Sequence, residues 1–257
     1  MSPAVDMEDH DASVAVDRGL WMYGVVPGGS AAPDEVGVDR EPIEVVRAGD
    51  VAAVVSWMSL DRPPGRKAEL LAYHGVLDVL ARNGPVAPVR FGTVMADREA
   101  VVEFLEVQEA ELGEVLALLE GRRQFNLRAM YVEDAVLAEL VTLDPEIRDL
   151  HERTRELPED ASYPDRVRLG ELVVRGLEQR GAEDAALLLD TVLPRVAEHV
   201  DRTASDPSVV LDVALLVEES HADELVQVLE GLAEAVHERM RLELVGPMAP
   251  YDFAGAF

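Results

Sequence analysis

The residues that most often carry out chemistry are scattered along this sequence. The six histidines stand at positions 10, 74, 151, 199, 221 and 237, and no two have the spacing of metal ligands on one helix. The His-Glu pairs at residues 151 and 237 are each followed by an arginine where a zincin motif needs its second histidine. The absence of cysteine excludes disulfides, thiolate catalysis and cysteine zinc sites. The sequence therefore predicts no metal site.

Motifs for phosphate, dinucleotide or acyl-transfer chemistry are also missing. The only lysine is Lys67, and it does not end a Walker loop. Gly24, Gly28 and Gly29 lack the spacing of a dinucleotide fingerprint, and no Gly-x-Ser-x-Gly elbow occurs. Because the chain contains 51 Asp and Glu residues, adjacent carboxylates occur by chance and do not indicate acid–base catalysis. We predict no catalytic residue and no cofactor.

The net charge of the chain limits the kinds of partner that it can bind. The 51 acidic residues against 23 Lys and Arg give a net charge of −28. Such a surface repels phosphate backbones and anionic headgroups, and the basic pairs Arg66-Lys67 and Arg122-Arg123 are too short to offset it. No apolar run reaches the roughly 18 residues of a membrane span. We expect a cytoplasmic protein with no nucleic-acid or membrane partner.

Strand and helix patterns alternate through the first half of the chain. A hairpin is expected at Ala48-Gly49-Asp50, and Asp97 is a good helix N-cap. Apolar residues at three- and four-residue steps indicate helices, and short β-branched or aromatic runs indicate strands. The predicted elements are strands over residues 20–26, 43–47, 51–58 and 86–94, and helices over residues 68–83 and between Asp97 and Gly121.

The second half is richer in helix. Pro158 and Pro164 mark a loop, and Ser220 with Asp223 resembles a capping box at the start of a helix. The tail 246–257 is rich in proline and aromatic residues. The predicted elements are strands over residues 125–132, 209–217 and 242–245, and helices over residues 133–155 and 165–192 and through Leu225, Leu229, Leu232 and Val236.

These patterns predict an α+β protein. At 257 residues two domains are expected, each with a small, mainly antiparallel sheet covered by helices, ferredoxin-like or a variant of it. We predict a disordered acidic tail over residues 1–18, with no signal peptide. An N-terminal α+β domain is expected over residues 19–124. A C-terminal α+β domain with a helical insertion and the aromatic, proline-rich tail is expected over residues 125–257.

Three segments resemble the GvpL/GvpF family of gas vesicle proteins. Residues 85–94, Pro-Val-Ala-Pro-Val-Arg-Phe-Gly-Thr-Val, are similar to its signature strand, in which a Pro-x-Arg-Phe-Gly-Thr core follows a helix. Residues 20–26, with a Tyr-Gly pair, resemble the family's first strand. Residues 242–253 resemble its Gly-Pro-x-x-Pro-Tyr-x-Phe close, with Met248 and Ala249 in place of Trp and Pro. Only the extension before Gly19 falls outside the resemblance.

This resemblance implies two α+β domains, a cytoplasmic location at the gas vesicle and a role in gas vesicle organization. It implies no catalytic residue. The expected partners are the small, hydrophobic main shell protein and other gas vesicle accessory proteins, with this chain as a minor shell constituent or a chaperone-like assembly factor. A strand edge or helix groove could receive apolar shell segments while the acidic surface maintains solubility.

The motif residues have structural roles or contact a partner directly. They are Tyr23, Gly24, Pro88, Arg90, Phe91, Gly92, Thr93, Gly246, Pro247, Pro250, Tyr251 and Phe253. Two other functions stay open. A ferredoxin-like module that binds a small ligand would need an apolar pocket with convergent polar groups. An enzyme using carboxylates would need a cleft with two acids of perturbed pKa.

Overall fold

The computed structural model describes residues 17–204 and 206–255, without the side chains of residues 159 and 160. Most of the acidic tail predicted over residues 1–18 lies outside the described residues, although Arg18 already begins the first strand. Within the described residues the chain divides into two compact units, one of residues up to 79 together with 89–113 and the other of residues 80–88 together with those from 114 onward. The predicted boundary after residue 124 lies within a strand that starts at Arg122 and stays a prediction.

The first sheet is antiparallel, with the order β2-β3-β1-β4 and β5 also paired with β1. β1 and β3 are its centre, and residues 19–26 of β1 are all buried, so both faces of this strand are covered. The hairpin expected at Ala48-Gly49-Asp50 is confirmed, with Gly49 at a φ of +56°. The strands are β1 (Arg18–Pro27), β2 (Glu44–Ala48), β3 (Val51–Ser59), β4 (Ala87–Pro88) and β5 (Val94–Met95).

The two helices predicted in the first half of the chain are confirmed, and their bounds lie close to the predicted ones. α1 spans Lys67–Asn83 and α2 spans Arg98–Leu119. Asp97 caps α2, since its Oδ1 accepts a hydrogen bond from the Ala100 N–H at 2.9 Å. Both helices could be predicted because their apolar residues recur at helical spacing and clear stop signals follow them.

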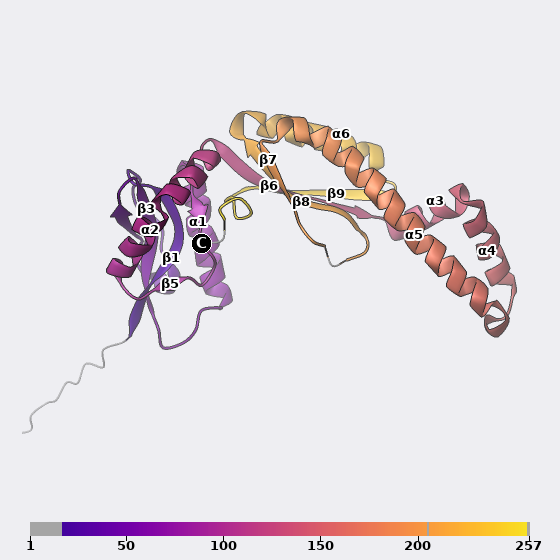
Figure 1. Cartoon of the computed structure of the whole chain (residues 1–257), viewed down its shortest axis with the longest axis horizontal. Coiled ribbons are helices and arrows are strands. Elements are labelled where there is room, and N and C mark those ends of the chain that lie inside the picture. The colour runs from indigo at the N-terminus through magenta and orange to yellow at the C-terminus, as the bar shows by residue number, and fades with distance from the viewer. Residues whose placement is uncertain (1–16, 205, 256–257) are drawn as a thin grey trace, which may run out of the picture. The chain divides into compact units, whose positions relative to one another are not determined.

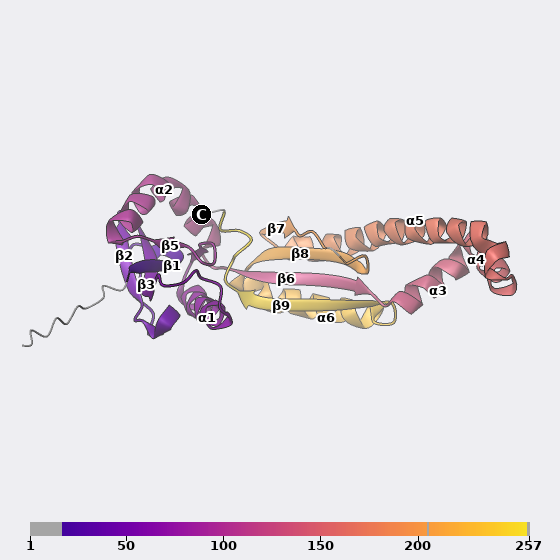
Figure 2. The same ribbon diagram turned by 90° about the horizontal axis from the view of Figure 1, so that it is seen from below.

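The second sheet has the order β7-β8-β6-β9, and all its pairings are antiparallel (Figure 2). From β6 to β9 the elements follow the strand-helix-strand-strand-helix-strand order of a βαββαβ unit, with three helices in the first helical position. The first unit departs from that order, because three strands precede its first helix. The strands are β6 (Arg122–Tyr131), β7 (Glu198–Asp201), β8 (Val209–Glu218) and β9 (Met240–Met248).

The main core of the second unit lies between this sheet and two helices, α5 (Glu159–Val192) and α6 (Ala222–Val236) (Figure 2). Alternate residues of β6 and β8 face it, as the period of two in a strand requires. They pack against Leu188 and Val192 of α5 and Leu225 and Leu229 of α6. This arrangement confirms the prediction of an antiparallel sheet covered by helices.

Three helices form a lobe with a core of its own, beyond the end of the second sheet (Figure 1). They are α3 (Glu133–Leu143), α4 (Pro145–Glu156) and the first half of α5. Asp144 caps α4, as its Oδ1 accepts hydrogen bonds from the N–H groups of Glu146 and Ile147. The core of the lobe contains the buried side chains of Leu140, Ile147, Leu150 and Leu172.

Two local predictions in this half were wrong. Pro164 is not in a loop but inside α5, which starts directly after Pro158, whose carbonyl accepts hydrogen bonds from the N–H groups of Ala161 and Ser162. The capping box at Ser220 does not form, because residues 219–221 make a 3₁₀ turn and α6 begins at Ala222 without a side-chain cap. The short strand β7 was not predicted at all.

Candidate functional site

Two of the three motif segments meet in the first unit. The Val89 N–H donates to the Tyr23 carbonyl at 3.2 Å, and the Met22 N–H donates to the Thr93 carbonyl at 3.0 Å. Gly24 follows these contacts directly, at an irregularity in the register of β1 with β3 between Met22 and Gly24. The opening segment and the Pro-x-Arg-Phe-Gly-Thr segment therefore form one structural feature, although about seventy residues separate them in the sequence.

An aromatic cluster joins these two segments to α1. Phe91 packs edge-on against Trp21 and Tyr73, with ring centroids 5.2 and 5.4 Å apart. The buried Tyr23 stacks on Tyr73, and its hydroxyl accepts a hydrogen bond from the Val38 N–H at 2.7 Å. Burial raises the pKa of Tyr23, and it raises the pKa of Tyr73 to about 12. These tyrosines remain neutral at physiological pH and hold the core together.

The strand predicted over residues 86–94 is broken by a turn. Only β4, which contains Pro88, and β5 are extended, and Arg90–Thr93 form the turn between them. The Thr93 N–H donates to the Arg90 carbonyl at 3.1 Å, and Gly92 has a φ of +86°. A positive φ at the third turn position is what a type II turn requires, which explains the glycine of the motif.

The closing motif is the end of β9 and the segment after it. A Cβ on Gly246 would lie 2.8 Å from the Phe125 ring and 2.9 Å from the Gln124 carbonyl, so no other residue fits there without a shift. The Asp252 N–H donates to the side chain of Gln124 at 3.0 Å, which ties this segment to β6. Pro247 belongs to β9, while Pro250, Tyr251 and Phe253 follow it. Direct contact of any motif residue with a partner stays a prediction.

A large apolar groove lies in the helical lobe. It has a volume of about 740 Å³ and lies between α3, α4 and α5. Its lining is Leu137, Ala138, Val141, Thr142, Ile147, His151, Arg166, Leu169, Gly170 and Val173. Gly170 leaves open space where a side chain would otherwise stand. Apolar side chains on three helices therefore surround a cavity that is open to solvent.

No motif residue lines this α3–α5 groove. The sequence does contain a signal for it: Leu137 and Val141 are four residues apart, as are Leu169 and Val173. Such spacing places each pair on one face of a helix. The same spacing also describes an ordinary core, and only the tertiary arrangement shows that these two faces leave a cavity between them.

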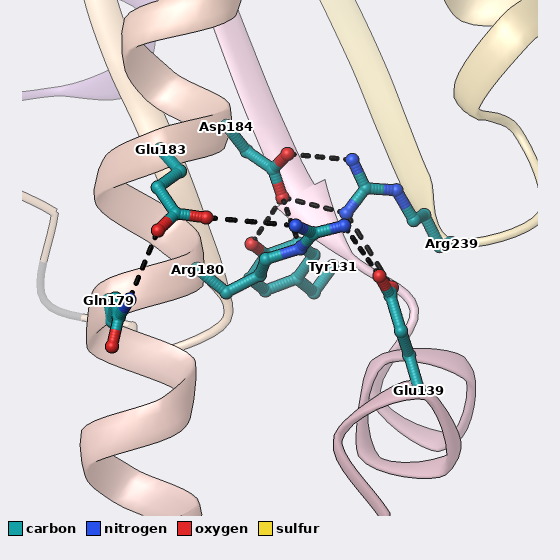
Figure 3. Close-up of polar contacts among 7 residues, drawn as sticks. All are labelled: Tyr131, Glu139, Gln179, Arg180, Glu183, Asp184 and Arg239. Atoms are coloured by element: carbon teal, nitrogen blue, oxygen red, sulfur yellow. Dashed lines mark hydrogen bonds and ion pairs between the residues drawn. The ribbon is translucent and has the colours of Figure 1, made fainter. Parts of the chain in front are cut away.

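A polar network fixes the lobe to the second sheet (Figure 3). Arg239, just before β9, makes a bidentate contact with Asp184 of α5, with N–O distances of 2.6 and 2.7 Å. The Tyr131 hydroxyl at the end of β6 donates to the same carboxylate at 2.6 Å. Arg180 of α5 donates to Glu139 of α3 at 2.5 Å. Side chains of α3, α5 and both strand ends are thus held in one arrangement.

The ionisation of this network follows from its contacts. Burial acts to raise the pKa of Asp184, but the hydrogen bonds from Arg239 and Tyr131 and the charges of Arg239 and Arg180 bring it below the usual range. Burial and the bond to Asp184 raise the pKa of Tyr131. Asp184 therefore stays ionised among two guanidinium groups and a neutral phenol, which is a stable structural arrangement rather than a proton donor–acceptor pair.

Among the described residues, no group of three or more His, Asp or Glu side chains is placed to hold a metal ion. None of the helices described is both long and apolar enough to cross a membrane.

Comparison with known proteins gives a consistent result. Residues 19–255 match the family model described as gas vesicle synthesis protein GvpL/GvpF. The chain is 30% identical to gas vesicle protein F of Streptomyces sp. (strain CB03234) over 237 residues, which cover 91% of this chain and 98% of that protein. It is 28% identical to gas vesicle protein L of the same organism, over 94% of this chain and 95% of that protein.

The fold agrees with a solved structure. The crystal structure of GvpF from Anabaena sp. PCC7120 superposes with a TM-score of 0.80 at 21% identity, covering 93% of this chain and 99% of that one. The family model spans all but the first 18 and the last two residues. The chain belongs to the GvpL/GvpF family of gas vesicle proteins.

Proposed function

We propose that this protein is a cytoplasmic assembly factor of the gas vesicle that binds an apolar segment of the main shell protein in the α3–α5 groove. The groove itself is the observation that supports this proposal. A cavity of about 740 Å³ with a mainly apolar lining fits an apolar helix better than a small polar ligand.

The lining favours an apolar helix over a small polar ligand because most of it is apolar. Thr142, His151 and Arg166 come from three different helices, and seven of the ten lining residues are apolar or glycine. Burial of apolar surface would provide the affinity, at roughly 25 cal/mol per Å². Other apolar side chains on the same helices are exposed as well, among them Leu143 and Val167.

The acidity of the chain supports the proposed function by limiting unspecific association. A net charge of −28 keeps the protein and its bound apolar segment from associating indiscriminately. The groove differs from that background, since the ionisable groups in its lining are Arg166 and His151 and no carboxylate lines it. An apolar segment can therefore enter without placing a carboxylate in an apolar surrounding.

Co-expression with the main shell protein tests the proposal. We expect a tagged chain to retain shell protein in the supernatant, and Val173→Asp to lose most of that effect, because it places a charge in the groove. Val107→Asp is the matched control, since Val107 is 75% exposed on α2 and the substitution adds the same charge.

Each result has a distinct meaning. If the unmodified chain neither binds shell protein nor changes its sedimentation, the assembly function is wrong. If it does both, and Val173→Asp behaves like Val107→Asp, the function stands and the groove is not the binding site. Circular dichroism of both variants establishes that they are folded.

A further inference from the structure

The strand β9 has a free edge. It is the outer strand of the second sheet, and within the described residues it pairs only with β6 (Figure 2). The other outer strand, β7, has four residues, whereas β9 has nine. A long outer strand presents unpaired N–H and C=O groups that can bind another strand.

The register with β6 identifies which backbone groups point outward. The Val132 N–H donates to the Arg239 carbonyl at 2.9 Å, next to the pair Tyr131 and Met240. Hydrogen-bonded and non-hydrogen-bonded pairs alternate along an antiparallel ladder. Residues 241, 243 and 245 therefore direct their N–H and C=O groups to β6, while those of Met240, Leu242 and Leu244 point to the free edge.

The side chains along this edge are suited to contact. Arg241 and Glu243 are exposed on one face of the strand, and neither takes part in an ion pair with another described residue. Leu242 and Leu244 are on the other face, only half buried. They line a groove of about 460 Å³ beside α6, together with Val226. The edge thus combines unused charges of both signs with uncovered apolar surface.

We infer that β9 pairs antiparallel with β9 of a second copy of this chain, with Leu242 opposite Leu242. In this register Met240 lies opposite Leu244, and all of these residues have outward-pointing backbone groups, so the pairs can hydrogen bond. Arg241 then lies opposite Glu243 of the second copy, and the contact occurs twice because the interface is isologous. The two sheets join into one.

Neighbouring registers are less favourable. Moving the centre of symmetry to residue 241 or 243 places Arg241 opposite Arg241, or Glu243 opposite Glu243, and like charges directly opposite each other are destabilising. The symmetric pairing also ends before Pro247, which has no N–H to donate. The charge pattern of β9 therefore favours this symmetric register over the two adjacent ones, and a second copy satisfies it without any other partner.

Charge exchange provides the test. The single variants Arg241→Glu and Glu243→Arg each place like charges opposite each other in a homodimer. We expect each to raise the dimer dissociation constant by about tenfold or more. A 1:1 mixture of the two variants restores both opposite-charge contacts, because one copy then has two glutamates and the other two arginines. The measurement is sedimentation equilibrium, in which the dimer has twice the 28.1 kDa mass of one chain.

The control is Arg175→Glu, which makes the same charge change at an exposed position of α5. It should leave the dissociation constant unchanged. The inference is overturned if the unmodified chain remains monomeric at concentrations up to about a millimolar, where even weak interfaces form. It is also overturned if the mixture of the two variants dimerises no better than each variant alone. It does not depend on the α3–α5 groove.

Discussion

Asp184 is the residue on which most of the polar network depends. Three hydrogen bonds converge on its carboxylate, two from Arg239 and one from Tyr131. Its side chain is 7% exposed, so water cannot replace these partners well if they are lost. The residue connects α5 with the ends of both β6 and β9, and thus the lobe with the sheet.

Replacement of Asp184 by alanine should be strongly destabilising. Asp184→Ala removes the bidentate partner of Arg239 and leaves its guanidinium with a 3.6 Å ion pair to Glu139, and breaking a partly buried charge pair of this kind costs about 3 kcal/mol. Tyr131→Phe is the milder comparison, with an expected cost of about 1 kcal/mol for one hydrogen bond. Urea unfolding of both variants measures the difference. Equal losses of unfolding free energy in the two variants would mean that the Asp184–Arg239 ion pair contributes little.

The lowered pKa of Asp184 predicts a pH dependence. Because its pKa in the folded protein lies below that of an unfolded aspartate, about 3.9, its stabilisation is fully present above about pH 5. It is lost as the pH falls through the folded-state pKa. The free energy of unfolding should therefore differ between the unmodified chain and Asp184→Asn at pH 6, and this difference should shrink below about pH 4. A constant difference down to pH 3 would contradict the assignment.

At the scale of elements, residues 90–93 of the family motif form a turn, whereas the sequence predicted a strand there. The apolar residues on either side of the turn, Val86 to Val89 and Val94, have the composition of a strand. The sequence therefore predicted a strand here despite the single glycine. The positive φ of Gly92 and the bond from Thr93 to Arg90 show that a tight turn interrupts the extended backbone there. A glycine between apolar runs is a weak signal unless the hydrogen bonds around it are known.

Substitution of Gly92 tests the turn directly. A Cβ at this position would approach no atom closer than Pro64 at 3.6 Å, so the cost comes from the backbone conformation alone. We expect Gly92→Ala to lower the free energy of unfolding by about 1 kcal/mol, and Gly92→Asn to lower it by less, because asparagine tolerates positive φ. Chemical denaturation measures both. A larger loss for asparagine than for alanine would show that space, not φ, limits this position.

Most other elements could be predicted because their signals are local. The apolar spacing in α1, α2 and α6 and the β-branched runs of β1, β3 and β8 are visible in the sequence itself. β7 could not be predicted, since Glu198–Asp201 are exposed and are held by backbone pairing to β8, a contact distant in sequence. The α3–α5 groove was missed for the same reason, as it results from the packing of three helices.

At the scale of the whole molecule, charge opposes every association between copies. Two chains of −28 repel each other, whereas the proposed β9 pairing gains only two Arg241–Glu243 contacts. Exposed ion pairs of this kind contribute about 0 to 1 kcal/mol each. The general repulsion should therefore determine how dimerisation responds to salt.

Salt should strengthen the dimer. The Debye length falls from about 10 Å at 0.1 M to about 3 Å at 1 M, which screens the repulsion between the two acidic surfaces as well as the attraction of the two ion pairs. Because the repulsion involves far more charges, we expect the dissociation constant to fall several-fold between about 0.05 and 0.5 M NaCl. The mixture of Arg241→Glu and Glu243→Arg should respond in the same direction. A dissociation constant that rises with salt would mean that the local pairs at β9 outweigh the net charge of the chain.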